Sequence, residues 1–276
     1  MRLDAHQHFW HYVPEHYPWI TDRLSVLKRD YLPADLEPNL GALGFDGTIV
    51  VQARQDVGDT AFLLALAARH PLIKGVVGWV DLCSPDVGRQ LDAFARHPAL
   101  VGVRHIVHDE PDDDFMLRPD FRAGIARLQD YGLTYDLLLF PRHLSRAVSL
   151  VDQFPDQAFV LDHIAKPLIR EHLMSPWEED VRRLAERPNV VCKLSGLVTE
   201  ARWDCWQPAD IWPYLDVVVE AFGTSRLMIG SDWPVCTVAA DYARTMGLVI
   251  DYVNDRHPDA ADAILGGNAA AFYGVD

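Results

Sequence analysis

The chain has 276 residues, of which 49% are hydrophobic and 24% are charged, a composition typical of a globular protein with a sizeable core. Its formal net charge of −15 and the lack of any basic run disfavour nucleic acid, because binding to phosphates needs cationic groups. No apolar run approaches the ~20 residues of a membrane span, and the first residues lack the apolar segment of a secretion signal. The four cysteines are widely spaced, so neither a disulfide framework nor a thiolate zinc site is expected. We therefore expect a cytoplasmic protein with a small-molecule partner; no membrane or nucleic-acid contact and no particular oligomeric state is indicated.

Short apolar runs rich in β-branched residues alternate with longer amphipathic stretches along the chain. Eight such runs are predicted to be strands, at residues 2–6, 47–53, 74–80, 101–107, 133–140, 158–164, 190–196 and 226–232. Their near-continuous hydrophobicity is typical of parallel strands that are buried on both faces. The clearest helical patterns lie between them, at residues 59–70, 86–97, 119–132, 175–187 and 208–223.

This alternation predicts a single (β/α)8 TIM barrel over residues 1–276, because eight strand–helix repeats in about 250 residues match that fold. An open doubly wound sheet is the alternative. It predicts a glycine-rich loop after the first strand, whereas the sequence there is "DAHQHFWH". Active sites of TIM barrels lie at the C-terminal ends of the strands, so the polar residues that close each apolar run become site candidates.

Two histidines close the first predicted strand. His6 and His8 are two residues apart, a spacing that places both side chains on one face of a strand and aims both imidazoles into the barrel mouth. The alternative is a pair of surface histidines near the N-terminus. His11 is out of phase with this pair, which favours a structural role for it.

Further candidates close the sixth and eighth strands. In "IGSDWP", Asp232 follows a buried strand, where a carboxylate needs a cation, a metal or hydrogen-bond donors to offset its loss of water. Its alternative role is to cap the following helix. In "LDHIAKP", His163 ends the sixth strand, Asp162 is expected to point the opposite way, and Lys166 is either a substrate contact or a surface residue.

Other residues near the strand ends are candidates for binding a substrate. They are Trp10, Gln52, Arg54, Trp79, Asp81, Arg104 and His105. Trp10 lies in a long loop, residues 9–33, that also contains Tyr17 and Trp19; these aromatic side chains either stack on a sugar-like ring or pack over the barrel rim. Polar residues at other strand ends include His108, Lys193 and Ser195.

Taken in order, several segments resemble the amidohydrolase superfamily, and in particular its lactonase branch. These segments are "DAHQHFW", "VQAR", "GVVGWVDL", "GVRHIV", "LDHIAKP", "CKLSGL" and "IGSDWPV". The branch includes L-fucono- and L-rhamnono-lactonases and 2-pyrone-4,6-dicarboxylate lactonase. The resemblance extends from Asp4 to the closing "ILGGNAAAFYG", and it implies a (β/α)8 barrel that hydrolyses a lactone.

The sequence departs from the two-metal members of that superfamily. Those members use a carboxylated lysine or a glutamate on strand 4 and a histidine on strand 5, where this chain has "GVRHIV" and "LLLF". At most one metal is therefore expected, a Zn²⁺ held by residues of suitable type, namely His6, His8, His163 and Asp232. The resemblance to the lactonase branch implies that hydrolysis does not strictly require this metal.

We expect an enzyme that opens a sugar-acid lactone of the L-fuconolactone or L-rhamnonolactone type to the free aldonate. Asp232 would act as the general base on water. His6, His8 and His163 would stabilise the carbonyl oxygen, alone or through a bound zinc. Two alternatives stay open: a zinc-dependent decarboxylase of an aromatic acid, and a catalytically inactive barrel that serves as a binding module.

Overall fold

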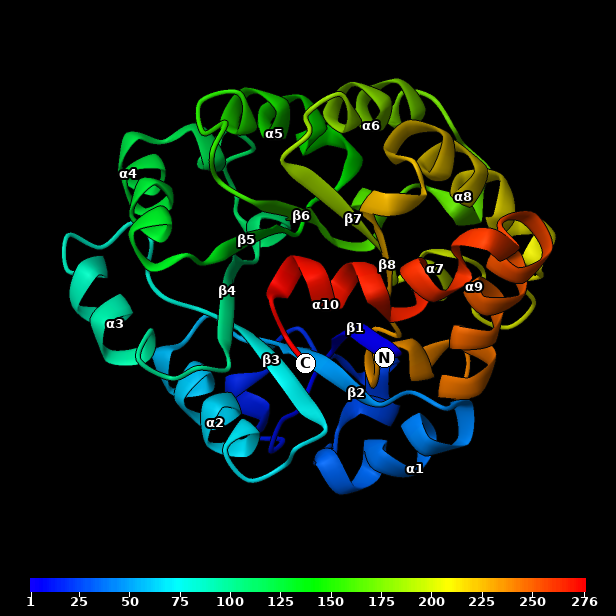
Figure 1. The fold of residues 1–276 in the computed structure, drawn as a ribbon, viewed down its shortest axis with the longest axis horizontal. Helices are drawn as coiled ribbons and strands as arrows, with labels where there is room; N and C mark the ends of the chain where they lie inside the picture. The colour runs from blue at the N-terminus through cyan, green and yellow to red at the C-terminus, as the bar shows by residue number, and fades with distance from the viewer.

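The computed structural model describes residues 1–276, and its eight strands form one sheet in which each strand pairs in parallel with the next along the chain. The strands are β1 (Leu3–Gln7), β2 (Gly47–Val51), β3 (Ile73–Gly78), β4 (Leu100–His105), β5 (Thr134–Leu137), β6 (Phe159–Leu161), β7 (Val190–Leu194) and β8 (Leu227–Ile229). β1 also packs against β8, and an isolated bridge joins Gln7 to Trp233, so the sheet closes (Figure 1). The predicted (β/α)8 barrel is confirmed, and the doubly wound alternative is wrong.

Helices follow the strands and surround the barrel (Figure 1). They are α1 (Pro33–Leu43), α2 (Val57–Ala67), α3 (Val87–Phe94), α4 (Pro119–Leu128), α5 (Leu144–Val151), α6 (Trp177–Ala185), α7 (Leu197–Glu200), α8 (Pro208–Phe222), α9 (Tyr242–Arg256) and α10 (Asn268–Tyr273). The five predicted helices are present as α2, α3, α4, α6 and α8. The other five helices, α1, α5, α7, α9 and α10, were not among the clearest helical patterns of the sequence. None of the helices combines the length and apolar character needed to span a bilayer.

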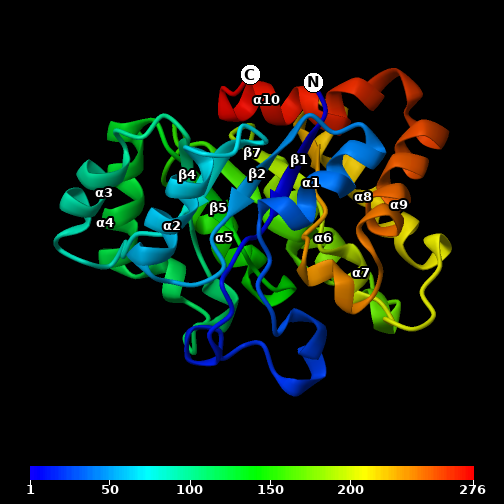
Figure 2. The same ribbon diagram turned by 90° about the horizontal axis from the view of Figure 1, so that it is seen from below.

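The two ends of the barrel are covered by different segments. α10 lies across the end where both chain termini are found, whereas the long segment after β1 lies at the opposite end (Figure 2). β1 runs from the first end toward the second, so the C-terminal ends of the parallel strands meet beneath that long segment. β6 and β8 are shorter than predicted, and the residues that follow them, including His163 and Asp232, lie in connecting turns rather than in the strands.

The turn after β6 has an unusual backbone. Four successive residues, His163 to Lys166, adopt left-handed conformations with φ between 48° and 61°, and Asp232 after β8 has a φ of 55°. Such conformations cost non-glycine residues about 1–2 kcal/mol each, and strain of this kind is typical of functional sites. The indole of Trp177 on α6 anchors the turn by donating a hydrogen bond of 2.7 Å to the backbone oxygen of Ile164.

Gly196, which follows β7, packs directly against this turn. Its φ is 60°, and a Cβ atom at this position would lie 2.5 Å from Nδ1 of His163. Backbone conformation and close packing therefore both require glycine here.

We predict that Gly196→Ala lowers the free energy of unfolding by more than the ~1–2 kcal/mol cost of a left-handed alanine, because the new methyl group also displaces His163. Gly132→Ala is the matched control, since Gly132 has a φ of 65° and no atom within 4 Å of the position of a Cβ. Urea denaturation of the two variants and the wild type measures both costs. Equal destabilisation by the two substitutions would contradict the close packing of Gly196 on His163.

Candidate active site

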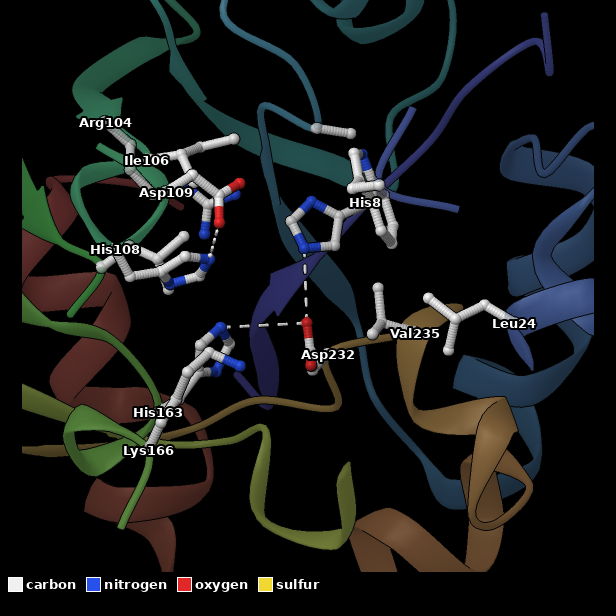
Figure 3. Close-up of a pocket in the computed structure, with 13 residues that line it drawn as sticks. His8, Leu24, Arg104, Ile106, His108, Asp109, His163, Lys166, Asp232 and Val235 are labelled. Carbon is white, nitrogen blue, oxygen red and sulfur yellow. Dashed lines mark ion pairs between the residues drawn. The ribbon is translucent and has the colours of Figure 1, made fainter. Parts of the chain in front are cut away.

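The C-terminal ends of the strands open into a cavity of about 240 Å³ (Figure 3). Its lining residues are His8, Trp19, Leu24, Ala53, Arg104, Ile106, His108, Asp109, Leu138, His163, Lys166, Asp232 and Val235. The mixture of apolar walls and a few convergent polar groups is typical of a small-molecule site.

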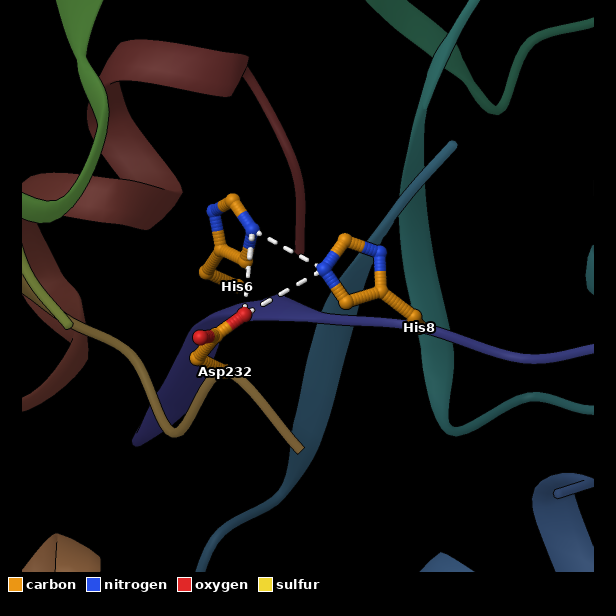
Figure 4. A group of neighbouring side chains, drawn as sticks. All are labelled: His6, His8 and Asp232. Carbon is orange, nitrogen blue, oxygen red and sulfur yellow. Dashed lines mark hydrogen bonds and ion pairs between the residues drawn. The ribbon is translucent and has the colours of Figure 1, made fainter. Parts of the chain in front are cut away.

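Asp232 occupies the centre of the polar part of this cavity. Its Oδ1 lies 3.3 Å from Nε2 of His8 and 3.9 Å from Nε2 of both His6 and His163 (Figures 3 and 4). All four side chains are almost completely buried. The structure therefore brings together the four residues that the sequence marked as catalytic, although β1, β6 and β8, which carry or precede them, are far apart in the sequence.

The partners of two imidazoles indicate where their ring protons lie. Nδ1 of His8 is 2.8 Å from the backbone oxygen of Val51, which can only accept, so Nδ1 carries a proton and Nε2 is the nitrogen that can offer a lone pair to a cation. Nε2 of His6 is 3.3 Å from Nη1 of Arg104, which can only donate, so this Nε2 also presents a lone pair. The two Nε2 atoms lie 3.3 Å apart, beside the carboxylate of Asp232 (Figure 4). Lone pairs of three groups therefore converge on one point.

This donor set fits a zinc ion. Two imidazole nitrogens and a carboxylate oxygen are ligands that Zn²⁺ prefers, and those of His6, His8 and Asp232 all lie within 4.8 Å of one another. Nε2 of His8 and Oδ1 of Asp232 both present lone pairs at a distance of 3.3 Å, and a cation at this point would offset their repulsion. Asp162, whose Oδ1 lies 3.3 Å from Nδ1 of His6, would support that ligand from behind.

His163 completes the polar cluster as a neutral group. Burial lowers its pKa to about 3. Its Nδ1 is 2.9 Å from Oγ of Ser195, and a serine hydroxyl that donates to Nδ1 leaves the ring proton on Nε2, which faces Asp232. Burial alone would raise the pKa of Asp232, but the neighbouring His163 holds it below its usual range. An ionised carboxylate and a neutral imidazole thus lie side by side.

A buried charge network supports His6 from inside the barrel. Nζ of Lys193 contacts the carboxylates of Asp136 and Asp162, at 3.2 Å from Oδ1 of Asp162. Nη1 of Arg104 lies 3.0 Å from the other oxygen of Asp162 and 3.3 Å from Nε2 of His6. Two cations thus balance two carboxylates, which is necessary because an unpaired buried charge is strongly destabilising.

The expectation that Asp162 points away from the site is therefore wrong. Strict alternation of side chains holds only within a strand, and β6 ends at Leu161. The left-handed turn that begins at His163 aims its imidazole into the mouth, while the carboxylate of Asp162 also lies inside the barrel.

Of the seven residues predicted to bind substrate, Arg104 is the one that lines the cavity. Trp10 is fully buried in the loop after β1, where its Nε1 donates to the backbone oxygen of Arg29. Gln52 is also buried, and its side-chain amide donates to the backbone oxygen of Arg104. Gln52 therefore holds Arg104 in place rather than facing the cavity.

Trp79 and His105 lie outside the barrel wall. Nε1 of Trp79 donates to Nδ1 of His105, whose Nε2 is 2.6 Å from a carboxylate oxygen of Glu110. The His105 ring stacks on Phe115 and meets Phe121 of α4 edge-on, so it fills the space between β4 and its helix.

Arg54 and Asp81 make local contacts away from the cavity lining. The guanidinium of Arg54 lies 3.7 Å from Oδ1 of Asp59, near the start of α2. Oδ1 of Asp81 accepts a hydrogen bond from the backbone nitrogen of Cys83 in the turn after β3.

Three further lining residues, Trp19, His108 and Lys166, were named as candidates in segments that follow a strand. The sequence analysis missed Leu24, Ala53, Ile106, Asp109, Leu138 and Val235. Asp109 did carry a signal, because it is a charged residue shortly after a strand. The aliphatic residues carried none, since nothing in the sequence separates them from core residues.

Comparisons with known proteins agree with this geometry. The amidohydrolase family model matches residues 3–275. An L-fucono-1,5-lactonase from Burkholderia multivorans is 41% identical to this chain, with 100% of this chain and 96% of the relative covered. An enzyme of the same name from Burkholderia ambifaria is 39% identical, with the same coverage.

A solved structure is similar over its full length. The crystal structure of an amidohydrolase from Burkholderia multivorans with bound zinc is 41% identical, covers 100% of both chains and superimposes with a TM-score of 0.97. Together with the family match over nearly every residue, these similarities establish that the chain belongs to the amidohydrolase family.

Proposed function

We infer that the protein is a lactonase that hydrolyses a sugar-acid lactone of the L-fucono-1,5-lactone type, working as one barrel domain over residues 1–276. The full-length identity of 41% to an L-fucono-1,5-lactonase supports this function. So does the ionised Asp232 beside neutral imidazoles, which is the arrangement that activation of a water molecule requires. The four unpaired cysteines are typical of the cytoplasm, where we place the enzyme.

The pairing of charges in the cavity favours a neutral substrate, and this observation carries the choice of substrate class. Arg104 is already paired with Asp162, and Nζ of Lys166 lies 2.9 Å from a carboxylate oxygen of Glu200. A dicarboxylate lactone, or the aromatic acid of a decarboxylase, would need free cations to clamp its carboxylates. A sugar-acid lactone carries no charge and needs none. The buried carboxylate of Asp232, surrounded by three histidines, favours a catalytic role over that of an inactive binding module.

We propose that Asp232 takes a proton from a water molecule as that water attacks the carbonyl carbon of the lactone. Nε2–H of His163 donates a hydrogen bond to the oxyanion that forms. The bond from the carbonyl carbon to the ring oxygen then breaks, and the proton held by Asp232 passes to that oxygen. The product is an open-chain hydroxy acid.

His6, His8 and Asp232 would hold a zinc ion, and a bound zinc would polarise the lactone carbonyl as a Lewis acid. Whether or not the metal is bound, the backbone oxygen of Val51 orients the ring of His8, and the carboxylate of Asp162 contacts the ring of His6. A lactone is an activated ester, so we expect its hydrolysis not to depend strictly on this metal.

Replacing the proposed base should remove most of the activity. We predict that Asp232→Asn lowers kcat by about 10²–10⁴-fold, because an amide cannot accept the proton of water. Hydrolysis of L-fucono-1,5-lactone, followed by proton release, measures the loss, and thermal unfolding checks that the fold is intact. Asp241→Asn is the control, since Asp241 caps α9 and asparagine caps a helix equally well. Near-normal turnover by Asp232→Asn would exclude Asp232 as the base.

Zinc binding is a separate prediction. We expect the protein to retain about one zinc ion per chain after dialysis against a zinc-containing buffer, and His8→Ala to lose it. Elemental analysis of both proteins measures the metal directly. His11→Ala serves as the control, because His11 is more than half exposed and pairs with Asp30 away from the cluster. Equal zinc content in His8→Ala and the wild type would place the metal elsewhere.

The pH dependence follows from the state of the two central groups. Because the pKa of Asp232 is held below its usual range and that of His163 is lowered to about 3, neither titrates near neutral pH. The carboxylate is active when ionised, so activity is lost only as the pH falls through its lowered pKa. We predict that kcat/KM, corrected for spontaneous hydrolysis, is constant from about pH 8 down to about pH 5. A loss of activity with a midpoint near pH 6.5 would contradict this.

A further inference from the structure

Most polar residues that line the cavity either belong to the proposed catalytic cluster or form an ion pair with a carboxylate, and two of them do neither. His8, His163 and Asp232 surround the point where the lactone carbonyl would lie. Arg104 and Lys166 are each paired with a carboxylate. His108 and Asp109 complete the polar lining, and neither has a role in the hydrolysis described above.

His108 and Asp109 follow β4 and contact each other across the edge of the cavity. Nε2 of His108 is 3.3 Å from Oδ1 of Asp109, and both lie on the side of the cavity away from Leu24 and Val235 (Figure 3). The His108 ring stacks on Phe140, with 4.7 Å between the ring centroids. This stacking fixes the plane of the imidazole and so the direction in which Nε2 points.

The chemistry of the pair suits hydroxyl groups. The side chain of Asp109 is 59% exposed and has no lysine or arginine within ion-pair distance; His108 is its one ionisable partner at that range. Burial lowers the pKa of His108 to about 2, so the ring is neutral. An ionised carboxylate accepts hydrogen bonds from two hydroxyl groups at once, and the neighbouring imidazole offers one more polar atom. Apart from Asp232, Asp109 is the one carboxylate that lines the cavity.

We propose that Asp109 and His108 form a hydroxyl-recognition subsite, which selects a polyhydroxylated lactone over an alkyl lactone of the same ring size. This proposal rests on the proposed lactonase function and adds specificity to it. The reacting ester lies at Asp232, and the hydroxyl groups of the ring extend toward Asp109. An alkyl lactone has no donor for that carboxylate, so it would displace the water around Asp109 without replacing its hydrogen bonds.

The test compares two six-membered lactones, L-fucono-1,5-lactone and δ-valerolactone, which share the ester but differ in their hydroxyl groups. We expect Asp109→Ala to lower kcat/KM for the hydroxylated lactone about 10–100-fold, the range typical of one lost hydrogen-bonding group that is charged. Its kcat/KM for δ-valerolactone should stay within about twofold of the wild type, because the ester chemistry is untouched. Asp112→Ala, in the same loop but outside the cavity lining, should change neither value.

Each further outcome decides one question. An equal loss on both lactones would overturn the subsite, since Asp109 would then serve the reaction or the fold. A wild-type enzyme that hydrolyses neither lactone would overturn the proposed function itself, and this inference with it.

A second variant tests the imidazole. His108→Phe preserves the stacking on Phe140 and removes Nε2, and it also removes Nδ1, which is buried without a hydrogen-bond partner. We expect an unchanged Tm and the same selective loss on the hydroxylated lactone. Full retention of the preference by His108→Phe would exclude His108 from the subsite.

Discussion

A carboxylate that is removed from water must be compensated by its surroundings, and the mouth of this barrel is built around one such group, Asp232. Its neighbours are imidazoles rather than lysine or arginine side chains. His163 turns its Nε2–H toward the carboxylate and favours its ionised form without a fixed cation, whereas His6 and His8 present lone pairs that suit a metal ion. The site therefore retains a base that water can use, together with a point that suits a zinc ion.

The arrangement of these imidazoles depends on groups that no ligand would touch. Asp162 faces His6, and Lys193 and Arg104 balance Asp162 and its neighbour Asp136 within the barrel. Because each of these charges is fully or almost fully buried, none can be removed alone without leaving its partner uncompensated. The support of the site thus extends well below the cavity, into charged residues within the barrel interior.

The barrel and the four central residues could be predicted from the sequence because both follow from periodicity. Strands buried on both faces read as apolar runs, and a polar residue that ends such a run points to the mouth. The same rule misplaced His105 and Trp79, since side chains alternate and a residue near a strand end can face the helices instead. The predicted orientation of Asp162 was wrong because the left-handed turn after β6 breaks the alternation of side chains along the strand. No local sequence pattern predicts that turn.

The central claim is that the cavity is a hydrolytic site for a neutral lactone, because its cations are already paired. The ratio of kcat/KM for L-fucono-1,5-lactone to that for 2-pyrone-4,6-dicarboxylate, measured on one preparation of the wild-type enzyme, tests this most directly. We predict a ratio of at least about 100, which corresponds to about 2.7 kcal/mol of selective transition-state stabilisation. A ratio below one would contradict the account, since it would require Arg104 and Lys166 to leave their carboxylate partners and bind the substrate instead.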